Sequence, residues 1–467
     1  MDGKVQIYID GKRLLVEKGT RLSDAISLEK PCGGNGKCGK CKVTVNGKEE
    51  LACRYVLESD VTVLLHEKGE MLSKTGAEEN GQLTDNVCLA LDIGTTTLAL
   101  ALVSLDENKI IKVITATNPQ RVFGADIITR VDYCTKKTVK ELHYLLVSEI
   151  NRMIETIGVG NVETMYVAAN VTMLHTLFGI DCSSIGVAPY KAAFLEGKTI
   201  SASEINVFGV KTVTSLPSVH SFVGADIVSG INYVGLPEKN GYNLLIDLGT
   251  NAEVVLFSEQ GGVATAAAAG PCFEGANISC GMSATDGAIF SFELTEESSF
   301  YDTVGGVSPK GVCGTGLIDV INELLCAGII DDSGYMDEAF CICENVYITP
   351  EDVRQFQLAK SAVCSAVLSL MQIENIDFSK IVNMYISGGF SAGVNLDNAA
   401  KCGIFPQELR DKAVVVNNSS LLGCVKYACY GDSVGGFVGN IKYADLSSNQ
   451  YFSELFIENM EFTNYQS

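Results

Sequence analysis

Two stretches of this chain end an apolar run in Asp, an aliphatic residue, Gly and Thr, and then continue with a second apolar run. The first is VCLALDIGTTTLALALVS at residues 87–104, and the second is LLIDLGTNAEVVLFS at residues 244–258. Asp at a strand end can hold a cation, Gly lets backbone N–H groups approach an anion, and Thr adds hydroxyl donors. The pattern therefore predicts phosphate chemistry at two similar turns on two similar lobes.

Each turn supplies a carboxylate and a set of small donor residues. The predicted cation and phosphate ligands are Asp92, Gly94, Thr95, Thr96 and Thr97 in the first turn, and Asp247, Gly249, Thr250 and Asn251 in the second. A further acidic residue, Asp226, lies 21 residues before Asp247 at the start of an expected helix. A carboxylate at that position can stabilise the helix N-terminus.

Further glycine-rich segments follow the second turn. GPCFEGANISCGM at residues 270–282 permits close backbone approach, and GVCGTG at residues 311–316 precedes an apolar-periodic helix expected at 317–327, where a helix N-terminus favours anions. An expected strand at 384–387 runs into Gly388 and Gly389. This last turn could pass under a nucleobase or a ribose.

Four cysteines near the N-terminus form a second candidate site. Cys32, Cys38 and Cys41 lie in the glycine-rich loop PCGGNGKCGKC, and Cys53 follows shortly after. Four thiolates can surround an iron–sulfur cluster, and the glycines leave amides free to donate to sulfur. A zinc site more often uses two paired CxxC knuckles with a longer separation, so we interpret the cysteines as cluster ligands.

The elements that must position these residues can be read from periodicity. Short alternating segments at 5–9, 14–16, 42–45 and 49–52, a helix at 21–29 and an Asn-Gly turn predict a small mixed α/β module. Residues 68–86 are polar and predict a linker. Residues 138–156 predict a core helix, and His175, on a helix expected from 171, is interpreted as a packed core histidine.

Composition limits the partners and the compartment. The chain has 467 residues and a formal net charge of −22, which argues against nucleic acid or an anionic membrane as a partner. Residues 1–10 have no apolar segment typical of a secretory signal. The 17 cysteines are therefore expected to be reduced thiols in the cytoplasm.

The cysteine loop and its hairpin resemble plant-type [2Fe–2S] ferredoxin modules, particularly the N-terminal module of the succinate dehydrogenase iron–sulfur subunit. This sequence has five residues between its first two cysteines, where those modules have four. The resemblance implies a β-grasp fold for the module and a [2Fe–2S] cluster on Cys32, Cys38, Cys41 and Cys53.

The order of the phosphate turns, helices and final Gly-Gly turn resembles the sugar kinase, heat-shock chaperone and actin superfamily over residues 87–430. The resemblance implies an α/β, two-lobed, ribonuclease-H-like ATPase body that binds ATP and Mg²⁺, with adenosine at Gly388 and Gly389. It gives Asp226 a catalytic role in positioning the attacking hydroxyl or water, beside the catalytic carboxylates Asp92 and Asp247. A structural N-terminal carboxylate remains the alternative for Asp226, and a member that has lost hydrolysis the alternative for the body.

These inferences divide the chain into four parts. We predict a ferredoxin-like domain at 1–70, a linker at 71–86, a first lobe at 87–235 and a second lobe at 236–467.

The whole chain resembles the reductive activators of corrinoid proteins, whose bodies carry motifs close to GPCFEGANISCGM, GVCGTGLIDV and ISGGF. The resemblance implies that ATP assists transfer of one electron from the cluster to the Co(II) of a separate corrinoid protein, which returns it to Co(I). It also implies a low-potential electron donor, with a homodimer as one possible assembly. This sequence shows no Asp-x-His-x-x-Gly corrinoid signature, so the cobalt is expected on the partner.

Two alternatives stay open. One is an activator of 2-hydroxyacyl-CoA dehydratases, which shares the hairpin fold but holds its cluster between two subunits and lacks a ferredoxin module. The other is a small-molecule kinase with a regulatory cluster, which predicts a phosphorylated product.

Overall fold

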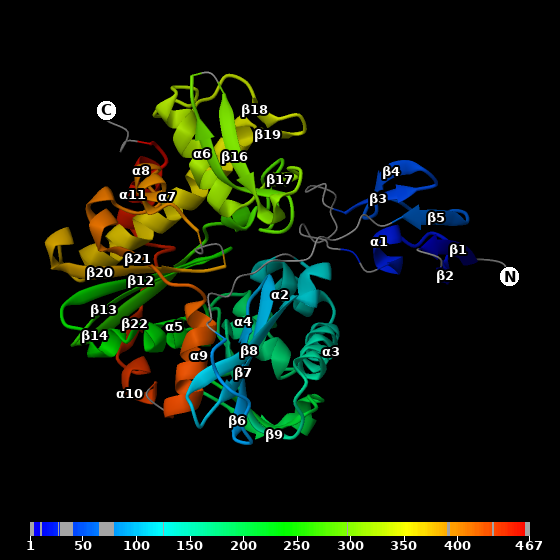
Figure 1. The fold of residues 1–467 in the computed structure, drawn as a ribbon, viewed down its shortest axis with the longest axis horizontal. Coiled ribbons are helices and arrows are strands. Elements are labelled where there is room, and N and C mark those ends of the chain that lie inside the picture. The colour runs from blue at the N-terminus through cyan, green and yellow to red at the C-terminus, as the bar shows by residue number, and fades with distance from the viewer. Residues whose placement is uncertain are drawn as a thin grey trace.

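The structure is a computed structural model that describes residues 4–9, 12–26, 28, 41–64, 79–124, 126–296, 298–389, 393–431 and 434–462. Two of the predicted cluster ligands, Cys32 and Cys38, lie outside these residues, as do residues 71–78 of the predicted linker. Figure 1 shows a small N-terminal module beside a larger body with two lobes.

The N-terminal module is a five-stranded mixed sheet with the order β2-β1-β5-β3-β4. Its elements are β1 (Lys4–Ile9), β2 (Lys12–Glu17), α1 (Leu22–Ala25), β3 (Lys42–Val45), β4 (Lys48–Leu51) and β5 (Val61–Leu64). Strand β1 runs parallel to β5 and antiparallel to β2, which is compatible with the predicted ferredoxin-like fold. The helix predicted over 21–29 is wrong in length, because Ile26 adopts an extended conformation and turns its side chain into the core.

The first lobe is built on a six-stranded sheet with the order β10-β11-β9-β6-β7-β8. Its strands are β6 (Val87–Ile93), β7 (Thr97–Ser104), β8 (Lys109–Thr117), β9 (Val162–Ala169), β10 (Thr199–Ser201) and β11 (Val210–Ser215). Its helices are α2 (Ile127–Lys136), α3 (Val139–Ile157) and α4 (Val171–Leu177). The predicted core helix at 138–156 corresponds to α3, whose apolar face is buried.

The second lobe repeats this topology with the order β21-β20-β12-β13-β14-β22. Its strands are β12 (Tyr242–Leu248), β13 (Ala252–Ser258), β14 (Gly261–Ala267), β20 (Ile381–Ser387), β21 (Ala413–Val415) and β22 (Ile441–Tyr443). In both sheets the hairpin strand is flanked on one side by its antiparallel partner and on the other by a parallel strand. This repetition confirms the predicted α/β body with two related lobes.

The second lobe carries further elements above its sheet. They are β15 (Ala288–Leu294), β16 (Ser299–Thr303), β17 (Gly311–Val312), β18 (Phe340–Cys343), β19 (Val346–Ile348), α6 (Gly314–Cys326), α7 (Pro350–Ile373), α8 (Leu396–Lys401) and α11 (Gln450–Glu458). Among the described residues, α7 is the one helix long and apolar enough to cross a membrane by length and composition, but 78% of that segment is buried inside the protein. This burial is typical of a core helix.

Two helices lie between the lobes: α5 (Ala225–Val234) and α9 (Ser419–Tyr430), followed by the short α10 (Gly435–Val438). The Ser229 hydroxyl donates to the Ser420 carbonyl oxygen at 2.6 Å, so a short side chain of α5 reaches the backbone of α9. By sequence α9 belongs to the predicted second lobe, yet it packs on β6 and β9 of the first.

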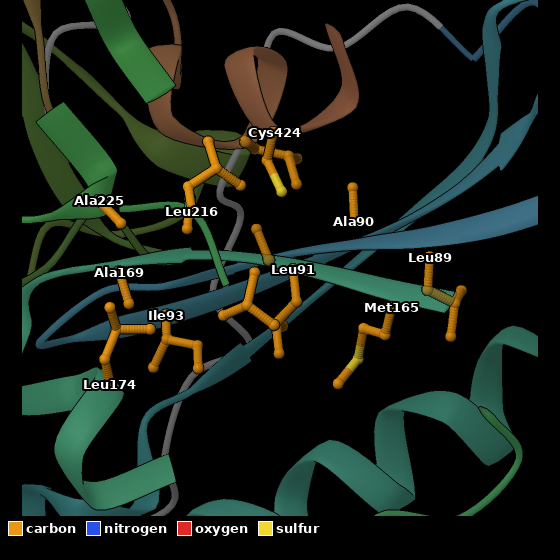
Figure 2. Close-up of a cluster of buried hydrophobic side chains, with 14 of the residues drawn as sticks. Leu89, Ala90, Leu91, Ile93, Met165, Ala169, Leu174, Leu216, Ala225 and Cys424 are labelled. Carbon is orange, nitrogen blue, oxygen red and sulfur yellow. The ribbon is translucent and has the colours of Figure 1, made fainter. Parts of the chain in front are cut away.

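The first hairpin strand, β6, is buried on both faces. Figure 2 shows Leu89, Leu91 and Ile93 on one side of the sheet near Met165, and Ala90 facing Cys424 of α9 on the other. A strand buried on both faces reads as a continuous apolar run rather than an alternating one. This packing fixes the end of β6, and therefore the position of the turn that carries the predicted phosphate ligands.

Candidate functional site

The two hairpin turns open into one cleft of about 620 Å³ between the lobes. Every predicted residue of the body lines it: Asp92, Gly94, Thr95, Thr96, Thr97, Asp226, Asp247, Gly249, Thr250, Asn251, Gly388 and Gly389. Residues up to 297 positions apart in the chain are thus brought to one concave site. The predicted roles of these residues stay predictions.

The first turn is held from behind by two polar side chains. The Gly94 N–H donates to the Thr97 carbonyl oxygen at 2.9 Å, and a Cβ at Gly94 would lie 2.7 Å from that oxygen. The Asn118 amide donates to the Gly94 carbonyl oxygen at 2.8 Å, and the buried Arg130 guanidinium donates to the Thr95 carbonyl oxygen at 2.5 Å. The carbonyl oxygens of Gly94 and Thr95 therefore point back into the lobe, while the three threonines of the turn line the cleft.

The second turn has the same backbone closure. The Gly249 N–H donates to the Asn251 carbonyl oxygen at 3.0 Å. The Thr250 N–H and hydroxyl both donate to the Glu274 carboxylate, at 2.9 Å and 3.2 Å. The backbone amide and hydroxyl of this turn therefore already hold an anion, which is the chemistry expected of a phosphate turn.

Four carboxylates crowd the floor of the cleft. Burial, with the charges of neighbouring carboxylates, raises the pKa of Asp92 to about 7 and that of Asp247 to about 8. Burial raises the pKa of Asp226 to about 6, and that of Glu253 well above its usual range. A nearby cation would stabilise the ionised form of these carboxylates and so lower their raised pKa values.

The donor set of the floor fits a magnesium ion bound together with phosphate. Mg²⁺ in nucleotide sites usually takes one or two carboxylates, with phosphate oxygens and water completing its shell. Within the described ranges, no three His, Cys, Asp or Glu side chains are placed to hold a metal by themselves. Asp92 and Asp247, one from each lobe, are the carboxylates that lie directly before the two turns.

Asp226 lies in the first turn of α5, whose N-cap is Gly224. Its carboxylate accepts a hydrogen bond from the Ile227 N–H at 2.9 Å, and its side chain also faces the cleft. The first contact suits a structural N-terminal carboxylate and the second suits a catalytic one. Both interpretations of Asp226 are therefore compatible with its position.

The Gly-Gly turn after β20 closes one end of the cleft. Gly388 has a φ of +122°, and a Cβ there would lie 2.0 Å from the Leu248 carbonyl oxygen. A Cβ at Gly389 would meet nothing within 4 Å. Beside this turn, the buried side-chain oxygen of Asn417 has no hydrogen-bond partner. A polar ligand such as an adenosine fits this end of the cleft. It can lie against a turn that has no side chains, and it can donate a hydrogen bond to the Asn417 side-chain oxygen.

Sequence reasoning missed several residues of the cleft. Glu274 belongs to a motif noted for its small residues, but nothing in its spacing marked the Glu itself. Ser420 of α9, which lines the cleft and donates to Asp92 at 2.7 Å, lies far from the turns in sequence. Arg130, which does not line the cleft but holds the first turn from behind, was missed as well. Only the position of Glu274 between two glycine-rich runs could have drawn attention to it.

The described half of the cysteine site is compact. Cys41 and Cys53 are buried thiols whose sulfur atoms lie 3.1 Å apart, without a disulfide bond. Two buried, unbridged thiols side by side suit a shared thiophilic metal centre. The predicted ligands Cys32 and Cys38 lie outside the described residues.

His175 fills the structural role expected of it. It is fully buried, its Nδ1 lies 2.7 Å from the Val171 carbonyl oxygen, and its Nε2 accepts a hydrogen bond from the Ala193 N–H at 3.0 Å. Burial lowers its pKa. Both ring nitrogens are used within the fold.

Two protein-family models match the body. One, described as the RACo middle region, matches residues 87–239, and the other, described as the C-terminal domain of RACo, the ASKHA domain, matches residues 241–467. The chain belongs to the RACo family. The resemblance to reductive activators of corrinoid proteins is thereby confirmed.

Relatives of this RACo-family chain carry related names. It is 27% identical over 360 residues to the corrinoid activation enzyme RamQ of Eubacterium limosum. The alignment covers 68% of this chain and 60% of RamQ. It is 26% identical over 375 residues to the [Co(II) methylated amine-specific corrinoid protein] reductase of Methanosarcina barkeri, which covers 71% and 68% of the two chains. The chain thus aligns with about three fifths of RamQ.

A solved structure supports the arrangement of the whole chain. The structure of a reductive activator for corrinoid, iron–sulfur protein matches with a TM-score of 0.74 and 26% identity, over 98% of both chains. The fold similarity therefore extends over the N-terminal module as well as the body.

Proposed function

We propose that this protein is an ATP-dependent reductive activator of a corrinoid protein. It passes one electron from a [2Fe–2S] cluster to the Co(II) of a separate corrinoid protein and so restores Co(I) for methyl transfer. The observation that carries the proposal is the pairing of the two phosphate-type turns and their carboxylates across one cleft, in a chain whose N-terminal module holds unbridged buried thiols. The names of its relatives support the same assignment.

In this proposal the cleft binds Mg-ATP. The turns at Gly94–Thr97 and Gly249–Asn251 donate to the phosphates, and the bare turn at Gly388 passes the adenosine. Asp92 and Asp247 hold the magnesium ion from opposite lobes. Asp226, whose pKa is raised by burial to about 6, is ionised at neutral pH and accepts a proton from the attacking water.

The cysteine site supplies the electron. Cys32, Cys38, Cys41 and Cys53 would hold the cluster, and the burial of the last two keeps water from that side of it. A bound [2Fe–2S] cluster of this class supplies one electron at about −400 mV. Reduction of a cobalt centre at a lower potential costs about 1.4 kcal/mol for each ~59 mV of mismatch, which is where ATP is required.

The two lobes provide a way to couple ATP binding and hydrolysis to electron transfer. Each phosphate turn belongs to a different lobe, so a nucleotide that contacts both changes the relative stability of the open and closed arrangements. We infer that closure favours a complex in which the cobalt ligation is altered, and that hydrolysis releases it. The electron enters from a low-potential donor, and we place the reaction in the cytoplasm, with no nucleic acid or membrane involved.

The test is anaerobic. The purified protein with its cluster, a low-potential reductant and a Co(II) corrinoid protein are mixed, and the cobalt absorbance is followed with and without Mg-ATP. We expect Co(I) to accumulate only when Mg-ATP is present. Equal reduction in its absence would contradict the coupling, and failure with every corrinoid protein tried would contradict the assignment.

The same mixture separates the rival activities. A small-molecule kinase would release a phosphorylated product without any corrinoid protein. A dehydratase activator would transfer its electron to a 2-hydroxyacyl-CoA dehydratase and leave the cobalt unchanged.

A further inference from the structure

Glu274 lies between the two phosphate turns and contacts both. One oxygen of its carboxylate accepts hydrogen bonds from the Thr250 N–H at 2.9 Å and the Thr250 hydroxyl at 3.2 Å. The other oxygen accepts from the Thr96 hydroxyl of the opposite lobe at 2.6 Å. One side chain therefore occupies donors of both turns and joins the lobes across the cleft.

The segment that carries Glu274 is firmly placed in the second lobe. It is a short turn, η5 (Pro271–Glu274), in which Phe273 is fully buried against Phe356 of α7. A Cβ at Gly275 would lie 2.2 Å from the Met282 carbonyl oxygen, and one at Gly314 would lie 1.9 Å from the Phe273 carbonyl oxygen. Because close backbone contacts hold the residues on both sides of it, Glu274 leaves the turns by rotation of its own side chain or by separation of the lobes.

The contacts of Glu274 are those of an anion in a phosphate site. A carboxylate and a phosphoryl group both accept hydrogen bonds through negatively charged oxygens, and both are favoured by backbone N–H and hydroxyl donors. The buried Arg130 behind the first turn interacts electrostatically with Glu274. A nucleotide phosphate that reaches the same donors must replace Glu274, since the donors cannot serve both anions at full strength.

We propose that Glu274 occupies the position of the terminal phosphate in the nucleotide-free cleft, links the lobes through Thr96, and is displaced when a nucleoside triphosphate binds. The inference rests on the proposed nucleotide function of the cleft. It makes Glu274 the residue through which the arrival of a terminal phosphate breaks one contact between the lobes. Ligands that lack this phosphate leave the link in place.

Nucleotide affinity tests the proposal. Isothermal titration with Mg²⁺ compares the non-hydrolysable triphosphate AMP-PNP with adenosine, in the wild-type protein, Glu274→Gln and the matched control Glu293→Gln, an exposed carboxylate of β15. Because the Gln side chain keeps the shape of Glu and loses its charge, we expect Glu274→Gln to bind AMP-PNP about tenfold more tightly. Adenosine affinity and the control stay within about twofold.

Amide hydrogen exchange gives a second measurement that does not depend on affinity. In the nucleotide-free protein, the Thr250 N–H is protected by Glu274, so Glu274→Ala should accelerate its exchange. AMP-PNP should restore the protection in this variant, because a phosphate oxygen then accepts from the same amide. Unchanged exchange at Thr250 in Glu274→Ala would overturn the link.

The outcomes separate the two proposals. If wild type and Glu274→Gln bind AMP-PNP equally, or if the variant binds more weakly, the displacement of Glu274 is wrong while the nucleotide site stands. If neither protein binds any nucleotide, the proposed function fails and the role of Glu274 fails with it. Binding by the variant alone supports the displacement directly.

Discussion

Arg130 is a fully buried arginine directly behind the first phosphate turn. Its guanidinium donates to the carbonyl oxygens of Thr95 at 2.5 Å and Gly124 at 3.0 Å, and burial lowers its pKa to about 9. A buried cation paired with carbonyl dipoles pays a large desolvation cost, so its hydrogen bonds must compensate. We infer that Arg130 is kept for the positive potential that it gives the turn.

The first prediction concerns this arginine. Replacing Arg130 by Met leaves two buried carbonyl oxygens without donors, which should lower the free energy of unfolding by about 2–4 kcal/mol, measured by urea denaturation. Arg152→Met is the matched control, because Arg152 forms an exposed pair with Glu149 on α3 and should cost under about 1 kcal/mol. Equal losses in the two variants would contradict the structural importance of Arg130.

The raised pKa values of the cleft carboxylates predict that the stability of the fold depends on pH. In the unfolded chain Asp247 has a pKa of about 3.9, whereas burial raises it to about 8 in the folded protein. Between these values the folded state binds the extra proton, so stability falls as the pH rises from about 4 to about 8. Without nucleotide, the melting temperature should therefore decrease across this interval.

Asp247→Asn removes the titrating group and tests this origin. The variant should show a shallower fall of melting temperature between pH 5 and pH 8 than the wild type, measured by scanning calorimetry at low magnesium. Asp302→Asn, an exposed residue of β16, serves as the control and should keep the wild-type slope. A slope that is the same in all three proteins would show that Asp247 does not contribute.

Residues in the turns could be predicted from sequence because their chemistry is local. Asp92 lies near the end of the buried strand β6 and Thr95 comes just after it, so the strand end carries both into the cleft. Glu274 and Arg130 could not be predicted, since the partners that define their roles lie 178 and 35 positions away. The positions of these two residues depend on tertiary packing, which the spacing of residues in the sequence does not reveal.

At the level of elements, the contact between α5 and α9 connects the lobes. Gly423 of α9 approaches α5 so closely that a Cβ there would lie 1.8 Å from the Ser229 carbonyl oxygen. The Asn232 amide donates to the Gly423 carbonyl oxygen at 3.2 Å. The same helices also meet residues of the second sheet, including Leu245, in one hydrophobic cluster. Their contact therefore joins the two lobes.

Gly423→Ala should push α9 away from α5. We expect a loss of about 1–3 kcal/mol in the free energy of unfolding, because overpacking forces backbone shifts. In the proposed function it should also weaken the dependence of Co(I) formation on Mg-ATP, since the contact that joins the lobes is disturbed. Gly436→Ala in α10 is the control, because a Cβ there meets nothing within 4 Å. Wild-type stability and coupling in Gly423→Ala would contradict the close packing.

Elements were predicted well where periodicity is strong and less well where contacts are distant. Strand β6 and helix α3 lie where the sequence places them, because apolar spacing alone decides them. Helix α6 begins at Gly314, three residues before the predicted start, because its glycine-rich first turn packs against the Phe273 backbone. The packing of α9 on the first sheet had no sequence signal, since α9 contacts both lobes and its buried face mixes serines with apolar residues.

At the scale of the whole molecule, the duplicated sheets explain why one cleft can hold a nucleotide. Each lobe ends a hairpin strand at the same topological position, so the two turns face each other when the lobes pack through α5 and α9. The N-terminal module stands to one side in Figure 1, and Lys42 of β3 interacts electrostatically with Tyr347 of β19. The proposed cluster module and the nucleotide cleft are thus built from separate parts of the chain.

This separation predicts that the two cofactor sites can be disabled independently. Cys53→Ser removes one of the two adjacent buried thiols, and we expect the protein to lose the proposed cluster, seen as loss of iron, sulfide and visible absorption. The affinity for Mg-AMP-PNP should remain within about twofold of wild type, because distant sites behave additively. Co(I) formation should disappear although nucleotide still binds.

Cys341→Ser, which changes an exposed thiol of β18, should keep both the cluster and the activity. A Cys53→Ser protein that keeps its full cluster would remove Cys53 from the ligand set, and one that loses nucleotide binding would show that the module and the cleft depend on each other.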